Sequence, residues 1–197
     1  MRRRHTLGIL VAAAGLLTVA CSTKTIPPQP KHRTVVVTNG AMRFVPDLSG
    51  PERAAIADDV STFLQTLYAD AFIRPKAKGP TPVPDQYAAQ RIAGFFTPAA
   101  RLTLEQKADV FSLGPHLDLL AGQVQYSGGV TRDKNVITAL LSVQFTGAGS
   151  RVDEAATVVE FQQTGQLLLQ KSATGWIVRE FDLKIALKPP PPTPTQT

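Results

Sequence analysis

The chain has 197 residues, a formal net charge of +6, three histidines and a single cysteine. This length suits one domain with one hydrophobic core, flanked by extensions. A lone cysteine excludes a disulfide framework within the chain and a metal centre built from thiolates. His5, His32 and His116 are too scattered in sequence to suggest a metal centre built from histidines. We therefore expect no metal and no cofactor.

The first twenty residues have the features of an export signal. Arg2, Arg3 and Arg4 precede a run of apolar and small residues from 7 to 20. The run is shorter than the roughly twenty apolar residues that a transmembrane helix needs. A basic start, a short apolar segment and small residues before a processing point are typical of a secretory signal peptide, so we assign residues 1–20 to one.

The cysteine follows this run directly, as Cys21 behind Ala20. The stretch LLTVACST resembles the lipobox of bacterial lipoproteins, although Thr18 stands where the usual pattern has an aliphatic residue and Leu17 lies one position earlier. The resemblance implies cleavage between Ala20 and Cys21 and a diacylglyceryl group on the Cys21 thiol. It also implies an anchor on the extracytoplasmic side of the cell membrane. The alternative is an ordinary signal peptide whose apolar run ends in a cysteine.

The positive charge is concentrated in the segment that follows. Residues 21–49 form a basic tether containing Pro and Thr, with four Lys or Arg against Asp47, whereas residues 50–188 carry fourteen Lys or Arg and fourteen Asp or Glu. Basic residues beside a lipid anchor gain about 1 kcal/mol of binding free energy each from anionic lipid headgroups. The alternative, that these residues are solubilising charges of a linker, explains their presence equally well. No stripe of basic and aromatic residues occurs in the domain, so we expect no nucleic-acid partner.

The tether contains one stretch with strand character. RTVVVTNGAMRF predicts a strand, or a short hairpin that turns at Asn39 and Gly40, docked on the domain edge. Ser49 and Glu52 then have the spacing of a capping box, and the apolar residues that follow recur at helical spacing. This pattern predicts a helix of about four turns that ends before Pro75, since a proline-rich loop cannot continue it.

Two shorter helices are predicted next, and then the period changes. One helix covers about 85–96, and Thr97 and Pro98 restart another as N-cap and first residue. After Pro115, the stretches HLDLLAGQVQYS, VITALLSVQFT, ATVVEFQQTGQLLLQ and WIVREFDLKIAL alternate as half-buried antiparallel strands. Gly165 suggests a bulge in the third of them.

These elements predict an α+β domain over residues 50–187, in which N-terminal helices pack on a curved antiparallel sheet. A disordered proline-rich tail follows over 188–197. The order resembles the nuclear transport factor 2-like superfamily, cone-shaped domains that include ketosteroid isomerase and polyketide cyclases. The likeness is carried by the first helix, by FFTPAAR and by the closing LLLQKSATGWIVREFDL. Among exported bacterial members the chain is loosely similar to accessory proteins of Mce lipid-import systems, which usually carry a transmembrane helix in place of the lipobox.

The resemblance implies an apolar pocket between helix and sheet, and it supports a fold better than an activity. His116 and Asp118 are the candidate acid–base pair, because on an unbroken strand they share a face with Tyr126. The alternative is that both are solvated residues at the frayed start of a strand. No nucleophile-elbow, P-loop or zinc-protease motif occurs in the chain.

Two hypotheses about function follow. The first is a non-enzymatic, membrane-tethered interaction or accessory module of a cell-envelope complex, such as one for lipid transport, with an unidentified protein partner. The second is a pocket protein that takes a lipid or another apolar ligand, or an isomerase- or cyclase-like enzyme that uses Asp118 and His116. A wide apolar cavity with both side chains turned inward favours the second hypothesis. An interior filled by aromatic residues favours the first.

Overall fold

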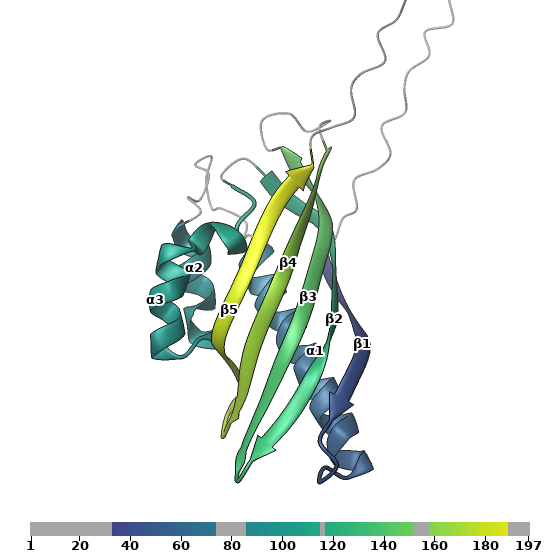
Figure 1. The fold of residues 1–197 in the computed structure, drawn as a ribbon. Coiled ribbons are helices and arrows are strands. Elements are labelled where there is room, and N and C mark those ends of the chain that lie inside the picture. Colours follow the sequence, from purple (N-terminus) through teal and green to yellow (C-terminus); the bar gives the residue numbers. More distant parts are fainter. Residues whose placement is uncertain (1–32, 74–85, 115–116, 152–157, 189–197) are drawn as a thin grey trace, which may run out of the picture.

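The computed structural model describes residues 33–73, 86–114, 117–151 and 158–188, which form one sheet with helices against one of its faces (Figure 1). The strands follow one another across the sheet in chain order: β1 (Thr34–Phe44), β2 (Leu117–Asp133), β3 (Val136–Arg151), β4 (Val158–Ser172) and β5 (Gly175–Lys188). β1 pairs with β2 in parallel, and the other three pairings are antiparallel.

The helices are α1 (Gly50–Phe72), α2 (Gln86–Ile92) and α3 (Pro98–Gln106), with 3₁₀ turns η1 (Ala93–Phe95) and η2 (Ala108–Phe111) after α2 and α3. Among the described helices, none combines the length and the apolar character that crossing a membrane requires.

The predicted fold class, N-terminal helices on a curved antiparallel sheet in the manner of a nuclear transport factor 2-like cone, is wrong. The sheet is mixed, strands make up most of the described chain, and β1 precedes the first helix. Residues 34–44, which lie in the predicted tether, form an edge strand of the sheet, which confirms the prediction of a strand docked on the domain edge. Their Val and Thr residues favour an extended backbone, but local alternation carries no information about a parallel partner 86 to 87 positions further along the chain, as in Thr34↔Ala121 and Met42↔Gly128.

The predicted helix starts are confirmed. Ser49 caps α1: its side chain accepts a hydrogen bond from the backbone N–H of Glu52, whose carboxylate accepts one from the N–H of Ser49 at 2.8 Å. Thr97 caps α3 through the N–H of Ala100. α1 ends at Phe72, before Pro75, and its buried residues are Ile56, Val60, Phe63, Leu64, Leu67, Tyr68, Ala71 and Phe72.

Aromatic rings fill the space between the helices and the sheet. The ring centroid of Phe145 on β3 lies 4.9 Å from that of Tyr68, 4.8 Å from that of Phe72 and 5.1 Å from that of Phe161. A second group, formed by Phe96, Phe111 and Phe181, has centroid separations of 5.5 to 5.7 Å. Aromatic pairs at such distances add about 0.5–1.5 kcal/mol each to the stabilisation from burial.

Glycine makes room for these rings. A Cβ atom at Gly122 would come within 2.3 Å of the Phe145 ring, and one at Gly147 within 2.6 Å of the Phe161 ring. Gly165, by contrast, has a φ of 151°, and a Cβ there would lie 2.0 Å from the carbonyl oxygen of Asp182. The irregularity in the β4–β5 pairing lies at Leu168 and not at Gly165, so the predicted position of the bulge is wrong.

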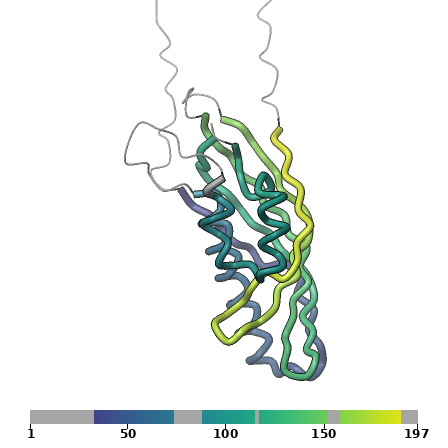
Figure 2. Tube along the Cα trace, turned by 90° about the vertical axis from the view of Figure 1, so that its left-hand side faces the viewer, coloured from purple at the N-terminus to yellow at the C-terminus, as the bar shows by residue number. Residues whose placement is uncertain are grey.

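The two ends of the sheet carry different features: the outer ends of β1 and β5 lie at one, and a polar cluster lies at the other. Thr34 at the start of β1 and Lys188 at the end of β5 lie in one cross-strand row that passes through Ala121, Ala148 and Glu160. The first and last strands therefore begin and finish at the same end of the sheet, as two perpendicular views show (Figure 1, Figure 2). We call this the terminal end.

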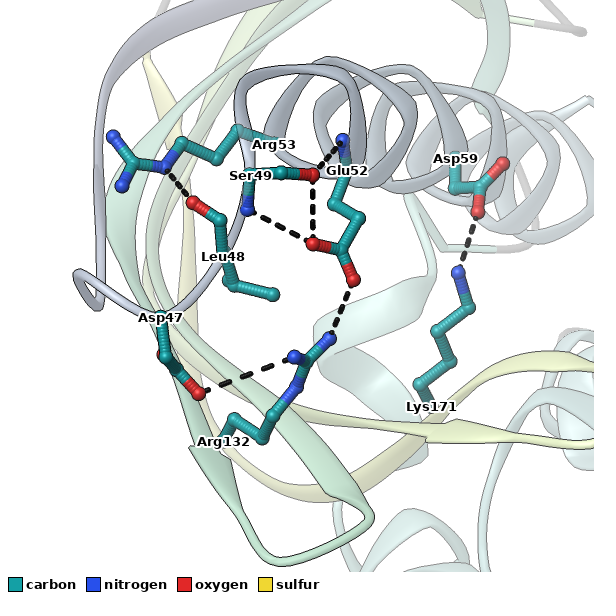
Figure 3. A network of polar contacts seen from close by, with 8 residues as sticks. All are labelled: Asp47, Leu48, Ser49, Glu52, Arg53, Asp59, Arg132 and Lys171. Carbon is teal, nitrogen blue, oxygen red and sulfur yellow. Dashed lines mark hydrogen bonds and ion pairs between the residues drawn. The ribbon is translucent and has the colours of Figure 1, made fainter.

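The opposite end carries a polar clamp formed by Asp47, Ser49, Glu52 and Arg132 (Figure 3). Arg132, near the turn between β2 and β3, donates to Glu52 Oε1 at 2.9 Å and lies 3.9 Å from Asp47 Oδ2. The backbone N–H of Ser49, the Arg132 guanidinium and the Ser49 hydroxyl lower the pKa of Glu52 from 4.5 to about 2. The clamp therefore ties the start of α1 to the β2–β3 hairpin through an ionised carboxylate.

We predict that Glu52→Gln lowers the thermal unfolding temperature at neutral pH. Because the folded-state pKa of Glu52 lies below its ordinary value, its stabilising contribution is present above about pH 4.5 and is lost as the pH falls toward about 2. The stability difference between wild type and variant should therefore shrink over that range, which urea unfolding across the pH series measures. Glu180→Gln, at a carboxylate side chain 69% exposed, is the control and should leave the unfolding free energy at neutral pH unchanged. A pH-independent difference, or equal losses in both variants, would contradict this role of Glu52.

Candidate functional site

The predicted acid–base pair is only partly within the described chain. His116 lies outside the described residues, as does Cys21. Asp118 lies near the start of β2, where its Oδ2 accepts a hydrogen bond from Arg33 Nη2 at 2.6 Å. This ion pair joins the residue before β1 to β2 at the terminal end, which gives Asp118 a structural partner.

Tyr126 lies on the inner, helix-covered face of β2 and is almost fully buried. Its hydroxyl is 2.7 Å from Ser61 Oγ and donates to the carbonyl oxygen of Ala57 at 3.2 Å, both on α1. Burial raises the pKa of Tyr126, the nearby Asp58 charge raises it further, and the Ser61 hydrogen bond opposes the shift. The hydroxyl therefore anchors α1 to the sheet as a neutral phenol.

The structure does not bring Asp118 and Tyr126 onto one face of β2. The register shifts between Leu119 and Ala121, so Leu117 and Leu119 are buried before the shift, whereas Gly122, Val124 and Tyr126 are buried after it. Such an irregularity places an extra residue in one strand and reverses which side chains face the core. The consecutive leucines 119 and 120 interrupt the polar–apolar alternation, and they are the sequence feature that could have located the shift.

One buried polar pair, Tyr68 and Gln163, is not predicted from the sequence. Gln163 on β4 is fully buried, and its Oε1 accepts a hydrogen bond from the Tyr68 hydroxyl at 2.7 Å, while its amide donates to the carbonyl oxygen of Val110. Burial raises the pKa of Tyr68. Gln163 lies two residues after Phe161 and therefore on the same face of the strand, which is the sequence feature that could have marked it as inward-facing. Because both the oxygen and the nitrogen of the Gln163 amide have partners, this pair joins α1, η2 and β4 and serves the fold.

The face of the sheet opposite the helices is exposed over most of its area, and we call it the open face. Across β1 to β4 it carries mainly amide and hydroxyl side chains: Thr38, Gln123, Gln125, Ser127, Ser142, Gln144, Thr146, Gln162, Thr164 and Gln166. Charged residues appear at its margins, on β5, at Glu160 and at Arg43 on β1. Such a surface can donate and accept hydrogen bonds through its uncharged side chains, and at its margin Lys188 Nζ lies 3.7 Å from Glu160 Oε2.

Shallow depressions occur on the open face and between helices. One of about 550 Å³ lies near the terminal end, over Ala121 and Ala148 and between Val36 and Lys188. A second of about 420 Å³ is lined by polar residues that include Gln125 and Gln144. A third of about 330 Å³ lies between α2 and α3. Within the described part of the chain, no group of three His, Cys, Asp or Glu side chains could hold a metal ion.

Comparison with known proteins does not place the chain in a family, because no protein-family model matches it and no curated protein is similar to it.

We predict that Tyr68→Phe costs more stability than Tyr126→Phe. Removal of the Tyr68 hydroxyl leaves Gln163 Oε1 without its partner in a fully buried site, which typically costs about 1–3 kcal/mol. Ser61 keeps its hydrogen bond to the carbonyl oxygen of Ala57 at 3.0 Å when Tyr126 loses its hydroxyl, so that variant should lose less than about 1 kcal/mol. Denaturant unfolding measures both values. Equal costs, or a larger cost at Tyr126, would contradict the assignment of the buried pair as a structural element.

Proposed function

We propose that the chain is an extracytoplasmic lipoprotein, held on the cell membrane through Cys21, whose folded part is a non-catalytic interaction module of a cell-envelope complex. The observation that carries this proposal is the aromatic packing between helices and sheet. Tyr68, Phe72, Phe145 and Phe161 are all buried and in mutual contact where a ligand-binding cone would need open volume.

The hydrogen bonds of the polar groups within the described chain support the same proposal. Asp118 is paired with Arg33, Tyr126 with Ser61, and Tyr68 with Gln163. Each of these contacts joins two elements of the fold, and none leaves an acid or base facing an apolar cavity. Recognition by this protein then rests on its surface, as expected of a module that binds a partner.

The position of the anchor limits where that partner can be. Arg33 lies twelve positions after Cys21, and a fully extended chain spans at most about 3.3–3.6 Å per residue, so the start of β1 stays within roughly 40 Å of the bilayer. The tether joins β1 at the terminal end of the sheet. A partner must therefore lie in, or on, the same membrane, or reach close to its surface.

We predict that Cys21→Ser removes the lipid anchor. The variant should be released as mature protein or accumulate as precursor, because the thiol that receives the diacylglyceryl group is absent. Membrane fractionation together with the intact mass of the protein measures this, and Ser22→Ala is the matched control that should stay acylated. Unchanged fractionation of Cys21→Ser, with no acyl mass on the wild type, would overturn the anchor.

The interaction role is tested by cross-linking and mass spectrometry in intact cells, alongside lipid analysis of the purified full chain. We expect a reproducible envelope protein whose cross-links persist in His116→Ala and Asp118→Ala, since buried apolar anchors and not one acid–base pair dominate such interfaces. A stoichiometric co-purified lipid with no protein partner would overturn the proposal. Complete loss of function in these two variants with folding intact would instead identify an enzyme.

A further inference from the structure

β1 is an edge strand whose first part, Thr34 to Thr38, lacks the usual protection of such strands, because the irregularity in its pairing (between Asn39 and Met42) and the exposed Arg43 lie further along. It pairs only with β2 in the described sheet, and residues 34–42 carry no charged side chain and no proline. Val36 is 55% exposed and lies on the open face beside Gln123. An uncharged run of β-branched residues whose outward backbone groups pair with no strand of the described sheet is a template for pairing with another strand.

The opposite edge of the same sheet is protected. The backbone of Phe96 forms a bridge with Val178 on β5, and the N–H of Thr97 donates to the carbonyl oxygen of Val178 at 2.9 Å. Further along β5, Asp182, Lys184 and Lys188 place exposed charges on that edge. Charges and covering segments are the ordinary means of preventing edge-to-edge association. The contrast marks β1 as the edge that is available for pairing.

The sequence of this edge also indicates which strand can pair with it. Residues Thr34–Thr38 read TVVVT, which is the same in both directions. When two copies of such a run pair antiparallel about a two-fold axis at Val36, each valine faces a valine and each threonine faces a threonine. Pairs between β-branched residues, and between threonines, are favourable across antiparallel strands. We propose that β1 pairs with β1 of a second copy of this chain, in the register that sets Val36 opposite Val36.

The residues around the run are compatible with this register. Arg33 is held by Asp118 and would lie opposite Asn39 of the second copy, so the pairing brings no like charges together. Gln65 Nε2 lies 3.5 Å from the carbonyl oxygen of Val35, a contact at the limit of hydrogen-bonding distance. An N–H from the second strand can replace it at a shorter distance.

Anchoring on a membrane raises the local concentration of the chain, which a pairing of only five residues requires. Five paired residues bury far less than the roughly 1,200 Å² of a typical stable interface, so the pairing would be weak between freely diffusing copies. The two Thr34 residues of the pair lie about 13 Å apart along the strands, which is well within the reach of both tethers. Anchoring on one membrane raises the effective concentration. In this respect the inference rests on the proposed lipid anchor.

The test is oxidative cross-linking, in native membranes, of full-chain variants that each add one cysteine to the native Cys21. In the proposed register, the Cβ atoms of Val36→Cys on the two copies lie about 4.5–5.5 Å apart, close to disulfide distance. Those of Thr38→Cys lie about 13 Å apart. Val36→Cys should therefore give at least about tenfold more disulfide-linked dimer than Thr38→Cys. The double variant Thr34→Cys, Thr38→Cys should cross-link like Val36→Cys, and the wild type, whose one thiol is Cys21, should not.

A second variant separates pairing from chance collision. Val36→Lys, added to the double-cysteine chain, should abolish the cross-link, because two lysines would then face each other across the strands. Val158→Lys, at a valine that is 49% exposed on β4, is the matched control and should leave it intact. Equal cross-linking of Val36→Cys and Thr38→Cys, or none in Val36→Cys while circular dichroism reports a native fold, would overturn the proposal. Absence of acyl mass on Cys21 in the same membranes would overturn the anchor, and the comparison of Val36→Cys with Thr38→Cys would still decide the pairing.

Discussion

The contact of Phe145 with Tyr68, Phe72 and Phe161 is the interaction on which the rest of the structure depends. It joins α1 to the centre of the sheet, and it requires Gly122 and Gly147, since a Cβ at either position would overlap a ring. Protein interiors packed to this degree leave few voids larger than a water molecule. The same rings that hold the helices on the sheet therefore fill the space between α1 and the centre of the sheet.

Local features of the fold could be predicted from the sequence, and long-range ones could not. Ser49 with Glu52, and Thr97 with Pro98, specify helix starts through bonds that close within one turn, and these predictions are confirmed. Polar–apolar alternation identified the strands from β2 to β5 because each has one buried face. The place of β1 in the sheet depends on a parallel partner distant in sequence, and the mixed sheet was therefore missed.

The candidate site shows the same division. The interpretation of Asp118 and Tyr126 as residues on one face assumed an unbroken strand, and the register shift after Leu119 removes that assumption. The pairing of Tyr68 with Gln163 joins residues 95 positions apart, so sequence alone could mark Gln163 as inward-facing without naming its partner. Lipid attachment at Cys21 remains a prediction from the sequence, since that residue lies outside the described chain. The terminal end, the open face and the unprotected β1 edge became visible only from the topology, because each combines residues from several strands.

The central claim is that aromatic rings leave no room for a ligand between α1 and the centre of the sheet, within the part of the chain that the structure describes. Benzene is a direct probe, because a dry apolar cavity of sufficient size binds it and stabilises the folded state, whereas a filled core does not. Thermal unfolding of the full chain should therefore be unchanged by benzene, while Phe145→Ala, which opens space beside Tyr68 and Phe161, should be stabilised by it. A rise in the unfolding temperature of the wild-type chain with benzene would show an open apolar interior and would contradict the account.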